Sequence, residues 1–108
     1  MLKFVNLNQE NPQKSNSDKR LKNFNEIYAR FSKEKAESQS SRCSQCGIPY
    51  CQIHCPLQNN IPDWLQLTAE NRLQEAFEIS SATNNMPEVC GRICPQDRLC
   101  EGNCVIEQ

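Results

Sequence analysis

Eight cysteines constrain this chain more than any other feature of its sequence. The first four lie between Cys43 and Pro56 with the spacing C-x2-C-x4-C-x3-C-P. The second four lie between Cys90 and Cys104 with the spacing C-x3-C-P-x4-C-x3-C. The chain has only 108 residues, of which 37% are hydrophobic, and a chain of this size buries little apolar surface. We therefore expect the thiols to supplement a thin core as disulfides or as metal ligands.

The composition excludes some classes of partner. A net charge of −1 argues against nucleic acid, because phosphate contacts need a clustered excess of Lys and Arg. Basic residues do gather between positions 19 and 35, but glutamates lie among them, which indicates a solvated helix face. No apolar run has the length of a membrane span, and Met1–Val5 is too short for a signal peptide. We expect a cytoplasmic protein that binds neither membranes nor nucleic acid.

Three kinds of cross-link compete for the thiols. Disulfides are not expected in a reducing cytoplasm. Structural zinc sites favour paired C-x2-C knuckles or Cys/His sets, whereas this chain has one C-x2-C and otherwise gaps of three to five residues. Iron–sulfur clusters fit best, because ferredoxins carry a Cys-Pro downstream of their first ligands, and that cysteine binds the other cluster. Cys55-Pro56 has this position, and zinc stays as the alternative.

Residues between the cysteines suit a cluster site. Three glycines allow the backbone to approach an inorganic core: Gly47, Gly91 and Gly102. Cys90 and Cys94 are four residues apart, so one helical turn can direct both toward the same cluster. His54 lies between two cysteines, but enough thiols are present without it, so we expect it to be exposed or to support a ligand rather than to bind metal.

The N-terminal part divides into two predicted segments. Residues 1–16 are polar and hold a proline, which predicts a flexible arm that is extended or disordered. Residues 17–40 are predicted to form one amphipathic helix, with Ser17 as its N-cap. Its apolar stripe is spaced as one helix face, which we interpret as a docking face, and consists of Leu21, Phe24, Ile27, Tyr28 and Phe31.

The remaining residues, 41–108, are predicted to form a helical domain. Ile61-Pro62-Asp63 is typical of a helix start, and we expect this helix to end near Asn71. A second helix is predicted over 72–82, with Leu73, Ala76, Phe77 and Ile79 facing inward. Pro87 should open a further helical turn. No segment alternates with the period of a strand, so the predicted fold class is all-α with loops.

The combined motifs resemble a known family. They are Cys43–Pro56, the helix start Ile61-Pro62, Met86–Pro95 and Leu99–Cys104. Together they are similar to the N-terminal iron–sulfur domain of the glutamate synthase small (beta) subunit, which dihydropyrimidine dehydrogenase shares. The similarity covers about residues 18–106. It implies an α-helical ferredoxin-like domain with two 4Fe–4S clusters.

The resemblance also implies a ligand set. Carried over by motif, one cluster is held by Cys43, Cys46, Cys51 and Cys104. Three corners of the other cluster are held by Cys55, Cys94 and Cys100. For its fourth corner, dihydropyrimidine dehydrogenase implies a side-chain oxygen from beyond the last cysteine, whereas proximity favours Cys90. Both candidates stay open.

The resemblance finally implies a function in electron transfer. Members of the family continue into domains that bind FAD and NADPH, but three glycines cannot form a G-x-G-x-x-G loop here. The chain also offers no nucleophile–base pair and no paired carboxylates, so it is expected to catalyse nothing alone and to be the N-terminal piece of a larger subunit. The implied role is to relay electrons between flavins of an NADPH-dependent glutamate synthase-type oxidoreductase, with a large subunit as partner. The alternative is a structural or partner-docking module held by zinc or by a non-redox cluster.

Overall fold

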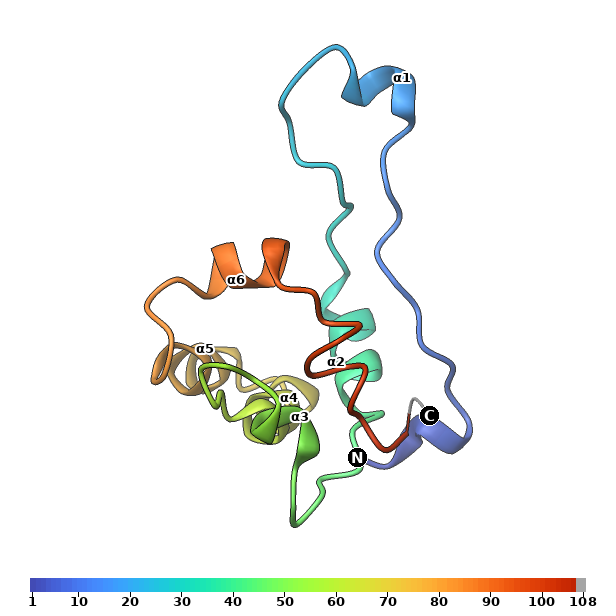
Figure 1. The fold of residues 1–108 in the computed structure, drawn as a ribbon. Coiled ribbons are helices and arrows are strands. Elements are labelled where there is room, and N and C mark those ends of the chain that lie inside the picture. Colours follow the sequence, from blue (N-terminus) through green and yellow to red (C-terminus); the bar gives the residue numbers. More distant parts are fainter. Residues whose placement is uncertain (107–108) are drawn as a thin grey trace.

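The fold is that of a computed structural model, which describes residues 1–106. Within them the chain forms one 3-10 helix and six α-helices (Figure 1). In chain order these are η1 (Lys3–Val5), α1 (Ser17–Arg20), α2 (Lys33–Ser40), α3 (Tyr50–Ile53), α4 (Ile61–Ala69), α5 (Leu73–Ser81) and α6 (Pro87–Ile93). The only strand-like pairing among the described residues is an isolated antiparallel bridge between Lys14 and Tyr28. The predicted all-α class is confirmed.

Helix α4 is the centre of the domain, since it packs against α5 and α2 and also touches α3. Its start agrees with the sequence prediction, because Pro62 lies in the first turn and Asp63 places a negative charge near the positive end of the helix dipole. Asn71 then adopts a left-handed conformation with φ 61° and turns the chain back into α5. Asparagine tolerates this conformation better than most residues.

The predicted extent of α5 is confirmed, but its predicted inward face is partly wrong. Ala76 is buried, with 7% of its surface exposed, whereas Leu73 and Phe77 are 50% and 58% exposed. The small Ala76 side chain lets α5 lie close to α4, whereas the side of α5 that carries Leu73 and Phe77 stays about half exposed.

A single asparagine joins the two ends of this helical pair. The side-chain amide of Asn59 donates to the Ser80 carbonyl at 2.8 Å and to the Thr83 hydroxyl at 2.9 Å. Its side-chain oxygen accepts a hydrogen bond of 2.8 Å from the indole nitrogen of Trp64. The loop that follows the first cysteines is thereby tied to both α4 and α5.

The core is thin, as the composition predicts. No large side chain of residues 1–106 is fully buried, and the buried positions are small or polar: Ser40, Ser41, Pro62 and Ala76. The Ser41 hydroxyl donates to the Ser38 carbonyl at 2.6 Å, which satisfies its burial. Burial of apolar side chains therefore does not explain why the cysteine loops are well ordered.

The first residues lie against the domain. The backbone N–H groups of Leu2 and Lys3 donate to the carbonyls of Cys43 and Ser41 at 2.9 and 3.0 Å. The guanidinium of Arg42 donates to the Leu7 carbonyl at 2.9 Å. This part of the predicted N-terminal arm therefore frames the start of the first cysteine loop.

The continuous helix predicted over 17–40 is wrong. The structure has two short helices there, α1 and α2, joined by an extended segment. Asn16, not Ser17, caps α1 by accepting from the backbone N–H of Asp18 at 2.9 Å. Leu21 and Phe24 of the apolar stripe stay exposed, and Asn23 bonds its own neighbouring backbone, so the long helix lacks the tertiary support that most helices need.

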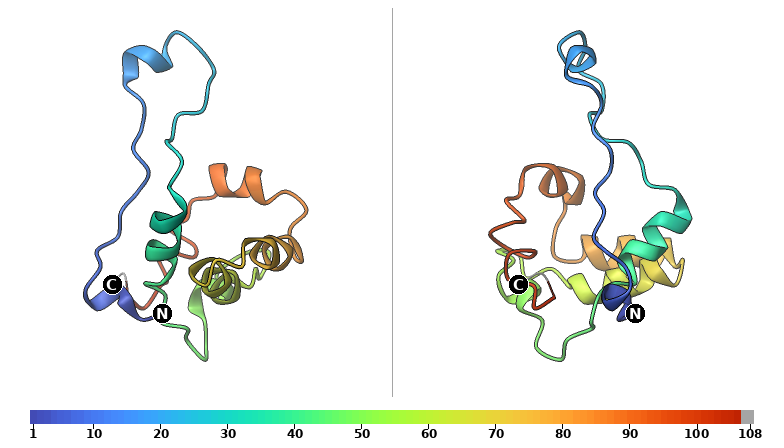
Figure 2. Two further views of the ribbon diagram at one scale, coloured as in Figure 1. Left: turned by 180° about the vertical axis from the view of Figure 1, so that it is seen from behind. Right: turned by 90° about the vertical axis from the view of Figure 1, so that its right-hand side faces the viewer.

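Residues 7–32 consequently form a protrusion whose two sides run next to each other, with α1 at the far end (Figures 1 and 2). This protrusion gives the described chain its long dimension of 46 Å, against 31 and 30 Å along the other axes. In residues 1–106 we find no helix that combines the length and the apolarity needed to cross a membrane.

Candidate functional site

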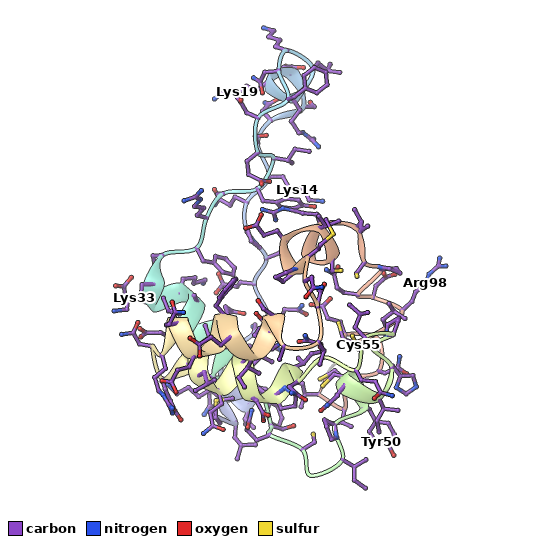
Figure 3. All side chains as sticks on the ribbon, turned by 90° about the vertical axis from the view of Figure 1, so that its left-hand side faces the viewer. Lys14, Lys19, Lys33, Tyr50, Cys55 and Arg98 are labelled. Carbon is purple, nitrogen blue, oxygen red and sulfur yellow. The ribbon has the colours of Figure 1, made fainter. Side chains whose placement is uncertain are left out.

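All eight cysteines are half-buried thiols, and they come from four places in the fold. The loop after α2 carries Cys43 and Cys46, and the region of α3 carries Cys51 and Cys55. Helix α6 carries Cys90 and has Cys94 as its C-cap, whereas the last described loop carries Cys100 and Cys104. The two cysteine runs of the sequence thus approach each other in the region where Cys55 lies (Figure 3).

A first group of thiols surrounds Cys51. Burial raises the pKa of Cys51 from its ordinary value of 9.0 to about 11, and the nearby thiols of Cys104, Cys43 and Cys100 raise it further. Such an electrostatic influence falls off with distance, so these side chains are neighbours. The structure therefore brings Cys104 of the second run beside Cys43 and Cys51 of the first.

A second group surrounds Cys94. Burial raises the pKa of the Cys94 thiol, followed by the charge and the hydrogen bond of Cys90 and by the charge of Cys55. Burial also raises the pKa of Cys100, and Glu101 and Cys55 add to that effect. Cys55 of the first run thus lies with Cys90, Cys94 and Cys100 of the second.

Short hydrogen bonds orient the thiols of the first loop. The sulfur of Cys43 accepts from the backbone and the side-chain nitrogen of Gln45, at 3.5 and 3.3 Å. The Ser44 hydroxyl and the Cys46 sulfur are 3.0 Å apart. Donors directed at sulfur favour a thiolate and tune any metal that it binds.

The last loop is fixed by its own backbone. The carbonyl of Gln96 accepts from the N–H groups of Glu101 and Gly102, at 2.9 and 3.1 Å, and the Asn103 amide donates to the Leu99 carbonyl at 2.7 Å. A Cβ atom at Gly102 would overlap the carbonyl of Asp97, so this glycine is required for the close approach. By contrast, a Cβ atom at Gly47 or at Gly91 would meet no atom within 4 Å.

His54 is exposed on the outside of α3. A ring nitrogen lies 2.9 Å from the carbonyl oxygen of Tyr50, and the two rings stack with their centroids 6.3 Å apart. The histidine thus takes part in a local helix contact, which agrees with the exposed position predicted for it.

The donor set fits an iron–sulfur cluster. In each group, thiols from separate loops lie close enough to raise one another's pKa, and a cuboidal cluster is held by thiolates of this kind, each binding its own iron. Within residues 1–106, no three His, Cys, Asp or Glu side chains are placed to hold one metal ion.

Sequence reasoning missed two supporting contacts. Gln45 donates from its side chain both to the Cys43 sulfur and to the carbonyl of Pro62, at 3.3 and 2.7 Å. Arg92 of α6 pairs with Glu26 of the protrusion at 2.7 Å. A glutamine inside the C-x2-C gap was the available signal for the first contact, whereas the second joins residues 66 positions apart and has no local signal.

Comparisons with known proteins agree with the donor set. A family model described as dihydropyrimidine dehydrogenase domain II, 4Fe-4S cluster, matches residues 20–108. The chain is 67% identical over 108 residues to the glutamate synthase (NADPH) small chain of Azospirillum brasilense, covering 100% of this chain and 22% of that protein. It is 50% identical over 103 residues to the glutamate synthase (NADPH) small chain of Escherichia coli K12, covering 95% of this chain and 22% of that protein.

A third relative is the glutamate synthase (NADPH) small chain of Bacillus subtilis strain 168, which is 39% identical over 112 residues, with 95% of this chain and 22% of that protein covered. The chain thus spans about a fifth of the length of these relatives. Because the family match covers most of the chain and includes every cysteine, the chain belongs to the family of dihydropyrimidine dehydrogenase domain II, the 4Fe–4S cluster domain.

Proposed function

We propose that this chain is the electron-transferring iron–sulfur part of an NADPH-dependent glutamate synthase small chain and that it holds two 4Fe–4S clusters. The single observation that carries the proposal is that each of the two groups contains thiols from both cysteine runs. Cys104 lies in the group of Cys51, and Cys55 lies in the group of Cys94. The names of the relatives support the choice of enzyme.

The proposed ligands follow these two groups. Cys43, Cys46, Cys51 and Cys104 hold the first cluster, and Cys55, Cys94 and Cys100 hold three corners of the second. The proximity of Cys51, Cys43 and Cys104 supports the first set, and that of Cys55 to Cys94 and Cys100 supports the second.

The fourth ligand of the second cluster has two candidates. Cys90 lies one helical turn before Cys94 and forms a hydrogen bond with its thiol, so it is within reach of the same cluster. The family resemblance instead implies a side-chain oxygen from the chain that follows the last cysteine. Serine substitution of Cys90 distinguishes the two, as set out below.

A bound 4Fe–4S cluster supplies reversible one-electron transfer. The influence of Cys100 in the second group on the pKa of Cys51 in the first supports a short distance between the two proposed ligand groups. A short path between the two groups is what a relay requires. Gln45 holds the first cysteine loop on α4, and the bonds of Gln96 hold the last loop, so both groups keep their geometry.

The rest of the proposed enzyme lies outside this chain. The relatives are about five times as long, and we place the FAD and NADPH sites in that additional length. We place a further flavin on a large partner subunit and propose that electrons pass through this domain between the two flavins. We also propose a cytoplasmic location, since a reducing compartment keeps cysteines available as metal ligands.

The test uses the whole small chain, purified without oxygen. Iron and acid-labile sulfide analysis should give two clusters of four irons, and NADPH should change their visible and paramagnetic resonance spectra. A protein with stoichiometric zinc, and with neither iron nor acid-labile sulfide, would instead establish the structural or partner-docking module held by zinc.

A further inference from the structure

The hydrogen bonds that orient the thiols of the first loop come from Ser44 and Gln45 and not from the protrusion of residues 7–32, so the shape of this protrusion calls for another explanation. We call residues 13–29 the arm, which is not the flexible N-terminal arm predicted over residues 1–16, and we call residues 17–25 its tip. Lys14 lies at the root of the arm and Lys19 at its far end, well away from the domain (Figure 3). The chain thus directs a structured segment into solvent.

The root of the arm is held firmly in place. Ser15 donates to the Ile27 carbonyl and Ala29 donates to the Gln13 carbonyl, each at 2.8 Å. Two cations lie over the Tyr28 ring, with the Lys14 ammonium 5.4 Å and the Arg92 guanidinium 5.8 Å from its centre. Because Arg92 belongs to α6, the arm has a fixed direction relative to the cysteine domain.

The tip is shaped by local hydrogen bonds. Asn16 caps α1, and the side chain of Asn23 both donates to the Lys19 carbonyl at 3.3 Å and accepts from the Asn25 N–H at 3.0 Å. These bonds display two large apolar side chains outward, since Leu21 is 86% exposed and Phe24 is 109% exposed. An aromatic side chain held in this way resembles the anchor residues that dominate protein interfaces.

The tip also differs in charge from the rest of the chain. It carries three basic side chains, Lys19, Arg20 and Lys22, against one acidic side chain, Asp18. The whole chain has a net charge of −1, so the tip is a local positive site on an otherwise acidic molecule. A negatively charged surface on a binding partner would raise the rate at which the tip associates with that partner and would fix the orientation of the tip.

We propose that the arm docks its tip into the large partner subunit, in an apolar pocket with an acidic rim that receives Phe24 and Leu21. This inference rests on the proposed function, which supplies that subunit. The arm would thereby fix the cysteine domain relative to the partner, because its root is bonded to α6, the helix that carries Cys90 and Cys94.

A second copy of this chain is a poorer receptor. An open cavity of about 750 Å³ lies between the arm and α6, but Arg30 and Arg92 balance Glu26 and Glu88 along its wall. A basic tip would meet no net negative charge there. This cavity therefore does not supply the acidic rim that the proposal requires.

The experiment measures association of the whole small chain with the large subunit, both carrying their cofactors. One variant combines Leu21→Ser with Phe24→Ser, and its matched control combines Leu73→Ser with Phe77→Ser on the exposed side of α5. A charge variant combines Lys19→Glu, Arg20→Glu and Lys22→Glu. We expect the tip variant to weaken association at least tenfold and the α5 control to leave it unchanged. The charge variant should also weaken association, and its dependence on salt should fall.

Cluster content and NADPH-dependent dye reduction by each isolated small chain are recorded alongside. Both the cluster content and the dye reduction of the tip variant should equal those of the parent chain. If the parent chain itself lacked clusters and dye reduction, the proposed function would be refuted, but the docking of the arm would not. Equal association of parent and tip variant, or equal loss in the tip variant and the α5 control, overturns the inference. It is also overturned if the tip variant abolishes self-association of the small chain, or its binding to vesicles of anionic phospholipid, in place of its binding to the large subunit.

Discussion

The side chain of Gln45 donates a hydrogen bond of 2.7 Å to the backbone carbonyl of Pro62, in the first turn of α4. The same nitrogen lies 3.3 Å from the Cys43 sulfur. One amide thus connects a proposed ligand to the helix on which the domain is built. Gln45 itself adopts a left-handed backbone conformation with φ 53°, which places its side chain over this junction.

Replacing Gln45 with alanine should therefore loosen the first cluster selectively. Losing one hydrogen bond of this kind costs about 1 kcal/mol, and the Cys43 sulfur also loses a donor. We expect the resonance signal of the first cluster to decay several times faster in air, with the second signal unaffected. Gln66→Ala is the control, since Gln66 bonds only the exposed Glu70 among the contacts recorded for it. Equal decay of both signals in the Gln45 variant would contradict this role.

Serine substitutions test whether each cluster takes ligands from both cysteine runs. Cys104→Ser and Cys46→Ser should remove the same resonance signal, because both residues are proposed ligands of the first cluster. Cys55→Ser and Cys94→Ser should remove the other signal. If Cys104→Ser and Cys94→Ser instead removed the same signal, the assignment of Cys104 to the first cluster and Cys94 to the second would be wrong.

Cys90→Ser in the whole small chain decides the fourth ligand of the second cluster. With a side-chain oxygen from the following chain as ligand, the iron content and both resonance signals should remain. With Cys90 as ligand, the second cluster should lose one iron or disappear. Iron analysis and low-temperature resonance spectra measure this directly, and Cys94→Ser gives the reference for loss of the cluster.

Removal of metal should loosen the cysteine loops more than the α4–α5 pair. The core is thin, so ligand binding and the order of these loops form one equilibrium. Hydrogen exchange followed by mass spectrometry should become faster over residues 43–56 and 94–106 after chelation. Residues 61–81 should change less, because Asn59 ties their two ends together. Unchanged exchange in the cysteine loops would show that they are ordered without metal.

The root of the arm should depend on the charge of Glu26. The N–H of Tyr28 donates to this carboxylate at 3.1 Å and, with the Arg92 charge, lowers the pKa of Glu26 below its ordinary value of 4.5. A lowered pKa means that the contact is present above 4.5 and is lost as the pH falls through the lower folded value. Glu26→Gln at neutral pH mimics the protonated form.

We expect this variant to speed hydrogen exchange over residues 13–16, where Ser15 bonds the opposite side of the arm. Glu78→Gln on α5 is the matched control, since Glu78 accepts only from Gln74 of its own helix among its recorded contacts. Equal exchange in both variants would mean that Glu26 does not hold the root.

The sequence by itself determined the chemistry and the local helices. The spacing of the cysteines indicated iron–sulfur ligands, and the family match agrees. Pro62 and Asp63 predicted the start of α4, and the apolar spacing after it predicted α5, because capping and helix periodicity act within a few residues. These elements could be predicted because the interactions that form them are local in the chain.

The family resemblance implied which cysteines meet, although no local pattern in the chain indicates it, and only the tertiary structure decided what the N-terminal segment becomes. Cys51 and Cys104 are neighbours because α4 and α5 fold the intervening chain back, and no local pattern records that distance. The stripe that contains Leu21 and Phe24 has helical spacing, yet it forms an arm in which these two side chains stay exposed. A short helix without tertiary burial gains too little from its own hydrogen bonds to offset the entropy of ordering its backbone.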